Sequence, residues 1–180
     1  MRVFLEKVNG EYQGASFPFR EGFSSGVLRL RWGTDNAMFV GMTSRGWNST
    51  GPEPYGLQRL RWTGKMPFEI KRINITPDGF KIAFTKPVEA TTGNNPQTYK
   101  LTTFTHPYHG AYGGPEIDQT APVVKSVKVS EDGMFATLVL DKMLRGHVYD
   151  FDLGLLRAKD KEDLLHRKAY YTVNEVPTAK

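Results

Sequence analysis

Short runs of alternating hydrophobic and polar residues, separated by turn-forming residues, fill most of this chain. Alternation that is rich in Val, Ile, Thr and aromatic side chains is typical of half-buried β-strands. It predicts strands at residues 2–8, 27–33, 37–43, 57–62, 68–76, 79–86, 98–105, 123–130, 134–141, 147–153 and 168–173. A short turn at 159–165, which Asp160 could cap, is the only helix candidate. We therefore expect an all-β fold.

Two predicted hairpins share the same turn signal. Asp78-Gly79 and Asp132-Gly133 each lie between alternating hydrophobic runs. Because glycine readily adopts a positive φ, both glycines are predicted to supply the tight turn of a hairpin. Paired hairpins of this kind are typical of a β-sandwich.

A change in pattern near residues 63–67 divides the chain in two. On its N-terminal side, the runs 29–33 and 60–64 echo one another, with arginines on one side of each strand and leucine and tryptophan on the other. On its C-terminal side, about 115 residues with about seven strands suit an immunoglobulin-like β-sandwich. We therefore predict an antiparallel β segment with a long loop at 1–64, followed by an immunoglobulin-like sandwich at 65–180.

The composition excludes sites that depend on cysteine and gives no sign of a membrane-spanning segment. The chain of 180 residues has no cysteine, which rules out disulfides, thiolate zinc sites, c-type haem attachment and cysteine nucleophiles within it. No run approaches the roughly 18 apolar residues of a membrane span, and the first ten residues lack the apolar core of a signal peptide. The net charge of +5 is too small to indicate a nucleic-acid partner unless it is concentrated on one face. It is not strongly concentrated along the chain, and only the first 64 residues lean basic.

The densest candidate for ligand binding is the loop at 41–56. It carries side chains that suit a ligand, namely Arg45, Trp47, Asn48 and Tyr55. Arginine offers a planar fork for a carboxylate or phosphate, and aromatic rings offer an apolar face for a sugar or an aromatic cofactor. The alternative is that the two rings only plug the loop onto the fold while Arg45 pairs with Glu53.

A second loop combines histidines, carboxylates and tyrosines. His106, His109, Glu116 and Asp118 could hold a metal if they converged, although loop spacing makes this a weak signal. Aromatic and histidine packing of a long connection is the alternative, with Tyr108 and Tyr112 between the histidines and the carboxylates. Asp150 and Asp152 share one face of a predicted strand, where they could bind calcium, act as an acid/base pair or face solvent. The sequence has no Gly-x-Ser-x-Gly elbow, P-loop or Gly-x-Gly-x-x-Gly motif.

Several motifs resemble a bacterial family. They are FVGMTSRGW at 39–47, YGLQRLRWTGKMPFEI at 55–70, YGGPEID at 112–118 and AYYTVNEVP at 169–177, with shorter matches at 77–80, 84–88, 146–149 and 164–166. Together they resemble the C-terminal region of glucose/sorbosone dehydrogenase-like proteins, where a pyrroloquinoline-quinone-type (PQQ-type) β-propeller ends and a further domain begins. The resemblance implies a last, blade-like β segment, export to the periplasm or beyond, and Arg45 on a loop near a cofactor carboxylate.

The same resemblance limits what the chain could do alone. A propeller needs several blades, and only about 60 residues here could belong to one, so a complete PQQ pocket would require a propeller outside this chain. No cofactor is expected within the chain, which would be either a piece of a longer protein or a stand-alone relative.

These observations leave three functional readings. The leading one is a non-catalytic structural or docking module, whose partner would be a propeller domain or subunit, or a second copy because an isolated blade exposes strand edges. The alternative is a carbohydrate-binding module with Trp47, Tyr55 and Tyr108 or Tyr112 as exposed, roughly coplanar stacking platforms. An enzyme in its own right would need His106, His109, Glu116 and Asp118 to converge on one point.

Overall fold

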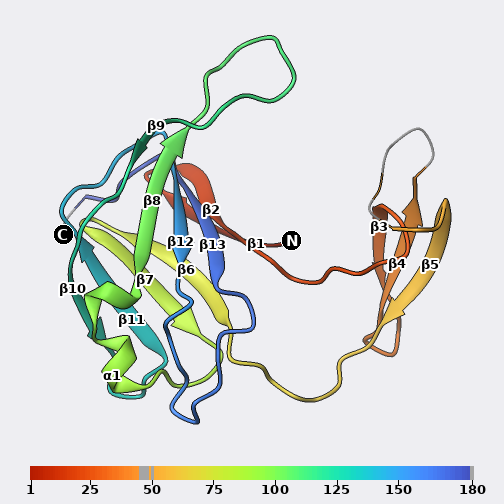
Figure 1. The fold of residues 1–180 in the computed structure, drawn as a ribbon, viewed down its shortest axis with the longest axis horizontal. Helices are drawn as coiled ribbons and strands as arrows, with labels where there is room; N and C mark the ends of the chain where they lie inside the picture. Colours follow the sequence, from red (N-terminus) through yellow and green to blue (C-terminus); the bar gives the residue numbers. More distant parts are fainter. Residues whose placement is uncertain (45–48, 50, 179–180) are drawn as a thin grey trace. The chain divides into compact units, whose positions relative to one another are not determined.

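The fold is all-β, as the alternating pattern predicts, and the computed structural model describes residues 1–44, 49 and 51–178 (Figure 1). The strands within the described residues are β1 Arg2–Val8, β2 Glu11–Phe17, β3 Val27–Trp32, β4 Met38–Thr43, β5 Tyr55–Leu60, β6 Ile70–Thr76, β7 Gly79–Phe84, β8 Lys100–Thr105, β9 Ile117–Thr120, β10 Val124–Val129, β11 Phe135–Leu140, β12 His147–Asp152 and β13 Lys168–Val173. Two short helical turns, α1 Ala90–Gly93 and the 3₁₀ turn η1 Pro96–Thr98, precede β8.

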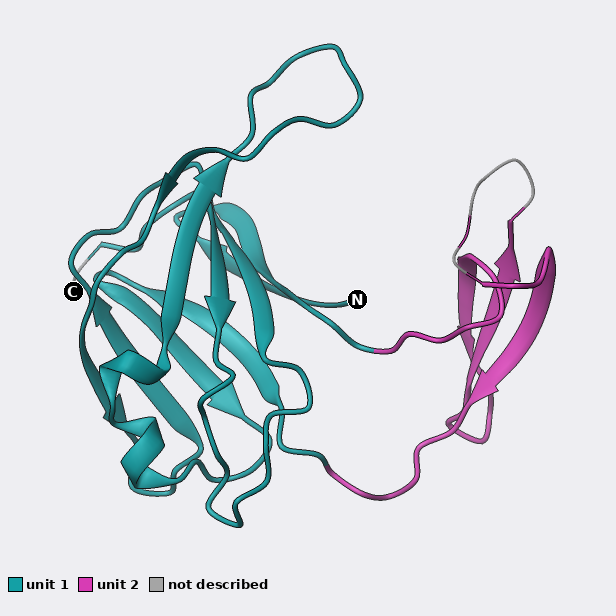
Figure 2. Cartoon of the chain, viewed as in Figure 1, with its two compact units in different colours: residues 1–19, 67–180 teal, residues 20–66 magenta. Residues whose placement is uncertain are grey.

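The chain forms two compact units (Figure 2). Residues Met1–Phe19 and Pro67–Lys180 make up unit 1, and residues Arg20–Met66 make up unit 2. Unit 2 is thus inserted between β2 and β6 of unit 1. The sequence placed residues 1–19 with the N-terminal segment, whereas in the structure β2 pairs with β13 through Ala15 and Tyr171, at the other end of the chain.

Unit 1 is a β-sandwich of two antiparallel sheets. One sheet has the order β1-β2-β13-β12-β8-β9, and the other has the order β10-β11-β7-β6. Strands of both sheets contribute alternate residues to one core, which is why the period-two pattern was so regular. The sandwich and the antiparallel pairing agree with the predicted fold class.

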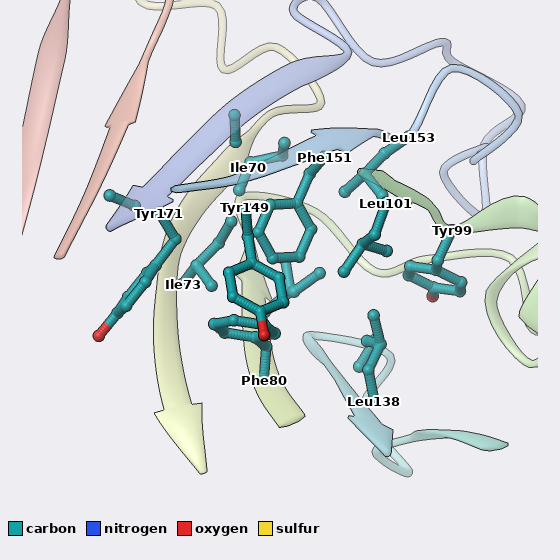
Figure 3. Close-up of a cluster of buried hydrophobic side chains, with 14 of the residues drawn as sticks. Ile70, Ile73, Phe80, Tyr99, Leu101, Leu138, Tyr149, Phe151, Leu153 and Tyr171 are labelled. Carbon is teal, nitrogen blue, oxygen red and sulfur yellow. The ribbon is translucent and has the colours of Figure 1, made fainter. Parts of the chain in front are cut away.

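Aromatic side chains from both sheets meet at the centre of this core (Figure 3). Phe80 of β7 makes edge contacts with Tyr149 and Phe151 of β12, at centroid distances of 5.0 Å, and with Tyr171 of β13 at 5.3 Å. All four rings are fully buried. Edge-to-face aromatic pairs contribute about 0.5–1.5 kcal/mol beyond their area burial, so this cluster joins the two sheets tightly.

A buried polar network also links the sheets. The Glu6 carboxylate on β1 accepts hydrogen bonds from the Tyr171 hydroxyl at 2.6 Å, the Ile75 backbone N–H at 2.8 Å and the Asn74 side chain at 2.9 Å. The Tyr171 hydroxyl in turn accepts from Gln13 at 3.0 Å. The N-terminal hairpin β1–β2 is therefore fixed to both sheets of the sandwich.

Unit 2 is a three-stranded antiparallel sheet with the order β3-β4-β5. Its small core consists of Met38, Val40 and Met42 of β4, against which Phe23 and Leu60 pack. Ser24, next to Phe23, donates its backbone N–H to the Gln58 side chain of β5 at 3.0 Å. A sheet of three strands is close to the lower limit for independent stability.

The structure corrects the local predictions at three places. No helix forms at 159–165, because Lys161 adopts a positive φ of 69° there, and the helical turns lie at 90–98 instead. Strands β2 and β9 were not predicted. Gly133 has the expected positive φ, but Gly79 does not, because the β6–β7 turn consists of Pro77 and Asp78.

Candidate functional site

The strand register gives the sheet of unit 2 two chemically different faces. In antiparallel sheets, residues that are paired across strands point to the same side. Arg31, Phe39 and Arg59 form one cross-strand row. Leu30, Val40 and Gln58 form the next row, and these side chains point to the opposite side. The prediction that β3 separates its arginines from leucine and tryptophan is confirmed.

We call the first side the arginine face. Besides the row just named, it holds Arg29 beside Gly41 and Leu57, and Thr43 beside Tyr55. The Arg59 guanidinium lies 5.8 Å from the centre of the Phe39 ring and forms an ion pair with Asp35. Tyr55 and Leu57 are 74% and 72% exposed. This side therefore combines fixed positive charge with accessible apolar surface.

We call the second side the neutral face. Its side chains come from all three strands and are Val27, Leu30, Trp32, Met38, Val40, Met42, Gln58 and Leu60. None of these described residues carries a charge. The methionines and Val40 are buried, but Trp32 and Leu30 on β3 remain 68% and 59% exposed. The apolar side chains of β3 on this face therefore border a buried cluster without being covered themselves.

The predicted ligand-binding residues of the 41–56 loop are only partly within the described structure. Arg45, Trp47 and Asn48 lie outside the described residues. Tyr55 is the first residue of β5 and is exposed on the arginine face. Ligand binding by this loop therefore stays a prediction.

The second predicted loop, between β8 and β9, extends away from the sandwich (Figure 1). Tyr108 and Tyr112 on it are fully exposed. The loop's histidines bond to its own backbone: His106 Nδ1 lies 3.1 Å from the Pro115 carbonyl oxygen, and His109 Nδ1 accepts from the Ala111 N–H at 3.1 Å. These contacts shape the loop and leave the tyrosine rings accessible.

The structure does not bring the four weak metal candidates together. Glu116 accepts a hydrogen bond from Gln119 at 3.2 Å, and Asp118 lies 3.0 Å from His147, while His106 and His109 have the partners given above. Among the described residues, no group of three or more histidines, aspartates and glutamates is placed to hold a metal ion. The convergence that an enzymatic site of this kind needs is not present in them.

Asp150, Asp152 and His166 have charged partners in the sandwich. Lys168 lies 3.1 Å from Asp150 and 3.8 Å from Asp152, and Arg167 lies 3.3 Å from Asp152, so two cations neutralise the two carboxylates on the shared face of β12. His166 Nδ1 lies 2.5 Å from Glu69. These contacts fix neighbouring segments to each other.

One open cavity of about 240 Å³ in the described sandwich is lined by Lys86, Pro87, Lys159 and Asp160. A hydrogen bond to Glu162 raises the pKa of Lys86, and Asp160 lies 3.2 Å from the same ammonium group. Two carboxylates neutralise Lys86, so Lys159 is the one lining ammonium group of this cavity without an ion pair among the described residues. No helix among the described residues is long and apolar enough to span a membrane.

Sequence comparison places the chain in no family. No protein-family model matches it, and a search of curated proteins finds no match. Among solved structures, the chain is similar to the S-layer protein rSbsC(31-844), with 25% identity and a TM-score of 0.47 over 63% of this chain and 15% of that one. The N-terminal part of the bacterial S-layer protein SbsC gives 23% identity and a TM-score of 0.46 over 63% of this chain and 25% of that one. The chain thus spans at most a quarter of these proteins, and the likeness is too low to carry an argument.

The resemblance to glucose/sorbosone dehydrogenase-like proteins is wrong. Neither a family model nor a curated protein of that kind matches, and the solved structures found are of an S-layer protein. The strand pairing adds a physical reason. Residues 1–19 pair within the sandwich, which leaves three strands among the described residues of unit 2, whereas a propeller blade has four. The expected propeller partner and the place of Arg45 beside a quinone cofactor lose their basis with it.

Proposed function

We propose that this chain is a non-catalytic structural module that docks onto a second copy of itself through the neutral face of unit 2. The observation that carries the proposal is the exposure of Trp32 and Leu30, at 68% and 59%, on a face with no charged side chain among the described residues. Neighbouring Val27 is 49% exposed and extends the same apolar strip.

Charge favours a second copy as the partner. A two-fold interface places the same patch on both subunits, so each residue of the patch meets its own kind. The neutral face can do this without repulsion, whereas the arginine face would oppose arginine to arginine. Burial of Trp32 and Leu30 in such an interface also removes exposed apolar surface from a sheet with a small core of its own. The proposal requires no cofactor.

Sedimentation velocity over a concentration series tests the docking. We expect the wild-type chain to form dimers and the Leu30→Ser/Trp32→Ser variant to dimerise at least tenfold more weakly, because tryptophan is a common hot spot of interfaces. Leu155→Ser is the matched control, since Leu155 is 54% exposed on the sandwich. A wild-type chain that stays monomeric at high concentration, or a double variant that dimerises normally, would overturn the proposal.

Carbohydrate binding is the second candidate, and the exposure of Tyr108 and Tyr112 favours it. Two accessible rings on a loop that is held by its own hydrogen bonds suit stacking against sugar rings. Calorimetry with neutral glycans checks this candidate: Tyr108→Ala/Tyr112→Ala would abolish saturable binding, while Tyr12→Ala, which removes a 68% exposed tyrosine elsewhere, would not. A wild-type chain that binds no glycan contradicts it.

Location outside the cytoplasm also stays a prediction. It followed from the resemblance that the comparisons overturned, and a neighbour's title as an S-layer protein describes that neighbour. Fractionation of cells that express the gene in its natural host would test it directly, with a cytoplasmic enzyme as the marker. Recovery of the chain only with that marker would contradict the prediction.

A further inference from the structure

The positive charge of this chain is concentrated in unit 2. Residues 20–66 contain seven basic and three acidic side chains, so they hold +4 of the net charge of +5. The sandwich is close to neutral by the same count, with 17 basic and 16 acidic side chains. A small net charge becomes significant where it is concentrated on one face, and the strand register of unit 2 shows which of these side chains share a face.

On the arginine face, much of that charge is free to meet a ligand. Arg29 and Arg31 form no ion pair among the described residues, and Asp35 is the carboxylate that pairs with Arg59. Arg29 and Arg31 lie two residues apart on β3, about 7 Å along the strand. Arg31 and Arg59 lie on the outer strands, about 10 Å apart across β4. Three guanidinium groups thus surround a patch that contains Phe39 and Gly41.

The spaces between the arginines are apolar and accessible. Gly41 has no side chain, so it leaves a shallow depression between its cross-strand neighbours Arg29 and Leu57. A Cβ atom at this position would lie 3.7 Å from the Cβ atom of Arg29. Tyr55 and Leu57 flank it with exposed surfaces. A suitable ligand therefore has negative groups set apart by segments with an apolar side.

We infer that the arginine face binds an acidic polysaccharide. Sugar rings offer apolar faces to Tyr55 and Phe39, and carboxylates on the same chain accept the paired N–H groups of arginine. A nucleic acid is favoured less, because the affinity of proteins for it comes largely from many phosphate contacts and this face offers three arginines. The inference does not depend on self-docking, which uses the opposite face.

Calorimetry with polygalacturonate, a polymer of carboxylated sugars, tests the inference. We expect saturable binding that weakens as salt rises, and a loss of tenfold or more in Arg29→Gln/Arg31→Gln. The matched control is Lys125→Gln/Lys128→Gln, which removes two exposed positive charges from an edge strand of the sandwich and should bind like the wild type. Arg29→Lys/Arg31→Lys should fall between them, because lysine keeps the charge but loses the planar fork.

Control ligands and variants distinguish this site from the neutral face and from the tyrosine loop between β8 and β9. Dextran, an uncharged polymer, should not bind, and a single-stranded oligothymidylate should bind more weakly than polygalacturonate. Leu30→Ser/Trp32→Ser should keep polymer binding even if it prevents dimerisation, and Tyr108→Ala/Tyr112→Ala should keep it too. Unchanged hydrogen-exchange protection of the β4 backbone amides, which pair with both neighbouring strands, shows that the arginine variants keep unit 2 folded.

Four results would overturn the inference. They are no saturable binding by the wild-type chain, equal binding of dextran, stronger binding of the oligonucleotide, and full binding by Arg29→Gln/Arg31→Gln. A monomeric chain that still binds polygalacturonate would reject self-docking alone.

Discussion

Glu6 is a half-buried residue whose loss should destabilise the sandwich. Its carboxylate accepts hydrogen bonds from the Tyr171 hydroxyl and the Ile75 N–H inside the protein. The pKa of Tyr171 is raised, chiefly by burial of the phenol and then by its hydrogen bond to Glu6. Glu6→Ala leaves both donors without this acceptor, which should lower the free energy of unfolding by about 2–3 kcal/mol. Urea denaturation measures this loss.

Glu11→Ala is the control for that experiment, because Glu11 is an exposed glutamate on the adjacent strand β2. It should change stability by less than about 0.5 kcal/mol. If Glu6→Ala were as mild as Glu11→Ala, the network would contribute little, and the N-terminal hairpin would be held by apolar contacts alone.

Lys86 should make stability depend on acid pH. Its hydrogen bond to Glu162 is the main cause that lowers the pKa of Glu162 below 4.5, while the pKa of Asp160 falls below 3.8 chiefly through the Glu162 backbone N–H and then through Lys86. A carboxylate with a lowered pKa in the folded state stabilises it above the unfolded pKa, and this contribution is lost as pH falls through the folded pKa. The stabilisation is thus present above about pH 4.5 and disappears below it.

We therefore expect Lys86→Met to lower the melting temperature at neutral pH and to lose less on acidification than the wild type. Thermal melts at about pH 7 and about pH 3 measure both effects, and the two proteins should converge at the acid end. Lys128→Met, at an exposed lysine of β10, should run parallel to the wild type throughout. A constant difference between Lys86→Met and the wild type would mean that the cluster acts by packing.

At the scale of elements, Gly79 allows β7 to approach β11. A Cβ atom at Gly79 would lie 2.0 Å from the Leu138 carbonyl oxygen, a backbone atom that cannot turn aside. Gly79→Ala should therefore displace a central strand pair and lower the free energy of unfolding by about 3 kcal/mol or more. Gly110→Ala is the control, because nothing lies within 4 Å of its Cβ position. Urea denaturation with equal losses in both variants would contradict the role of this close approach.

Strands with a strong period-two pattern were predictable from the sequence, and those without it were not. β6 and β12 alternate large apolar residues with polar ones, and both lie where the pattern placed them. β2 was not predicted, because small and polar residues hide its alternation: Gln13 and Ala15 point inward, and Gly14 and Ser16 point outward. β9 has four residues and no buried position. Both are defined by pairing with distant strands, which no local pattern reports.

The candidate site was predictable to the same degree. Alternation along β3 separated its arginines from leucine and tryptophan, because a strand turns successive side chains to opposite sides. The row of Arg31, Phe39 and Arg59 could not be anticipated, since it depends on how three strands align. The exposed tyrosines were recognisable as candidates, but their accessibility depends on how the loop folds.

For the whole molecule, the decisive feature is that unit 2 is an insertion with its own core. The sandwich closes through β2, β6 and β13 without any strand of unit 2, and its core cluster contains no residue of 20–66. The two units should therefore unfold separately. Unit 2, with its core of three buried residues, should unfold first.

Native-state hydrogen exchange measures this order directly, because it reports the free energy of opening of each unit separately. We expect the backbone amides of β4, the central strand of unit 2, to exchange through openings of lower free energy than those of β7 and β12 in the sandwich. A variant in which about ten Gly and Ser residues replace residues 20–66 should keep the urea midpoint of the sandwich, measured by far-UV circular dichroism. Equal opening free energies in the two units, or a deletion variant that fails to fold, would show that the sandwich needs unit 2 and that the insertion is part of one cooperative fold.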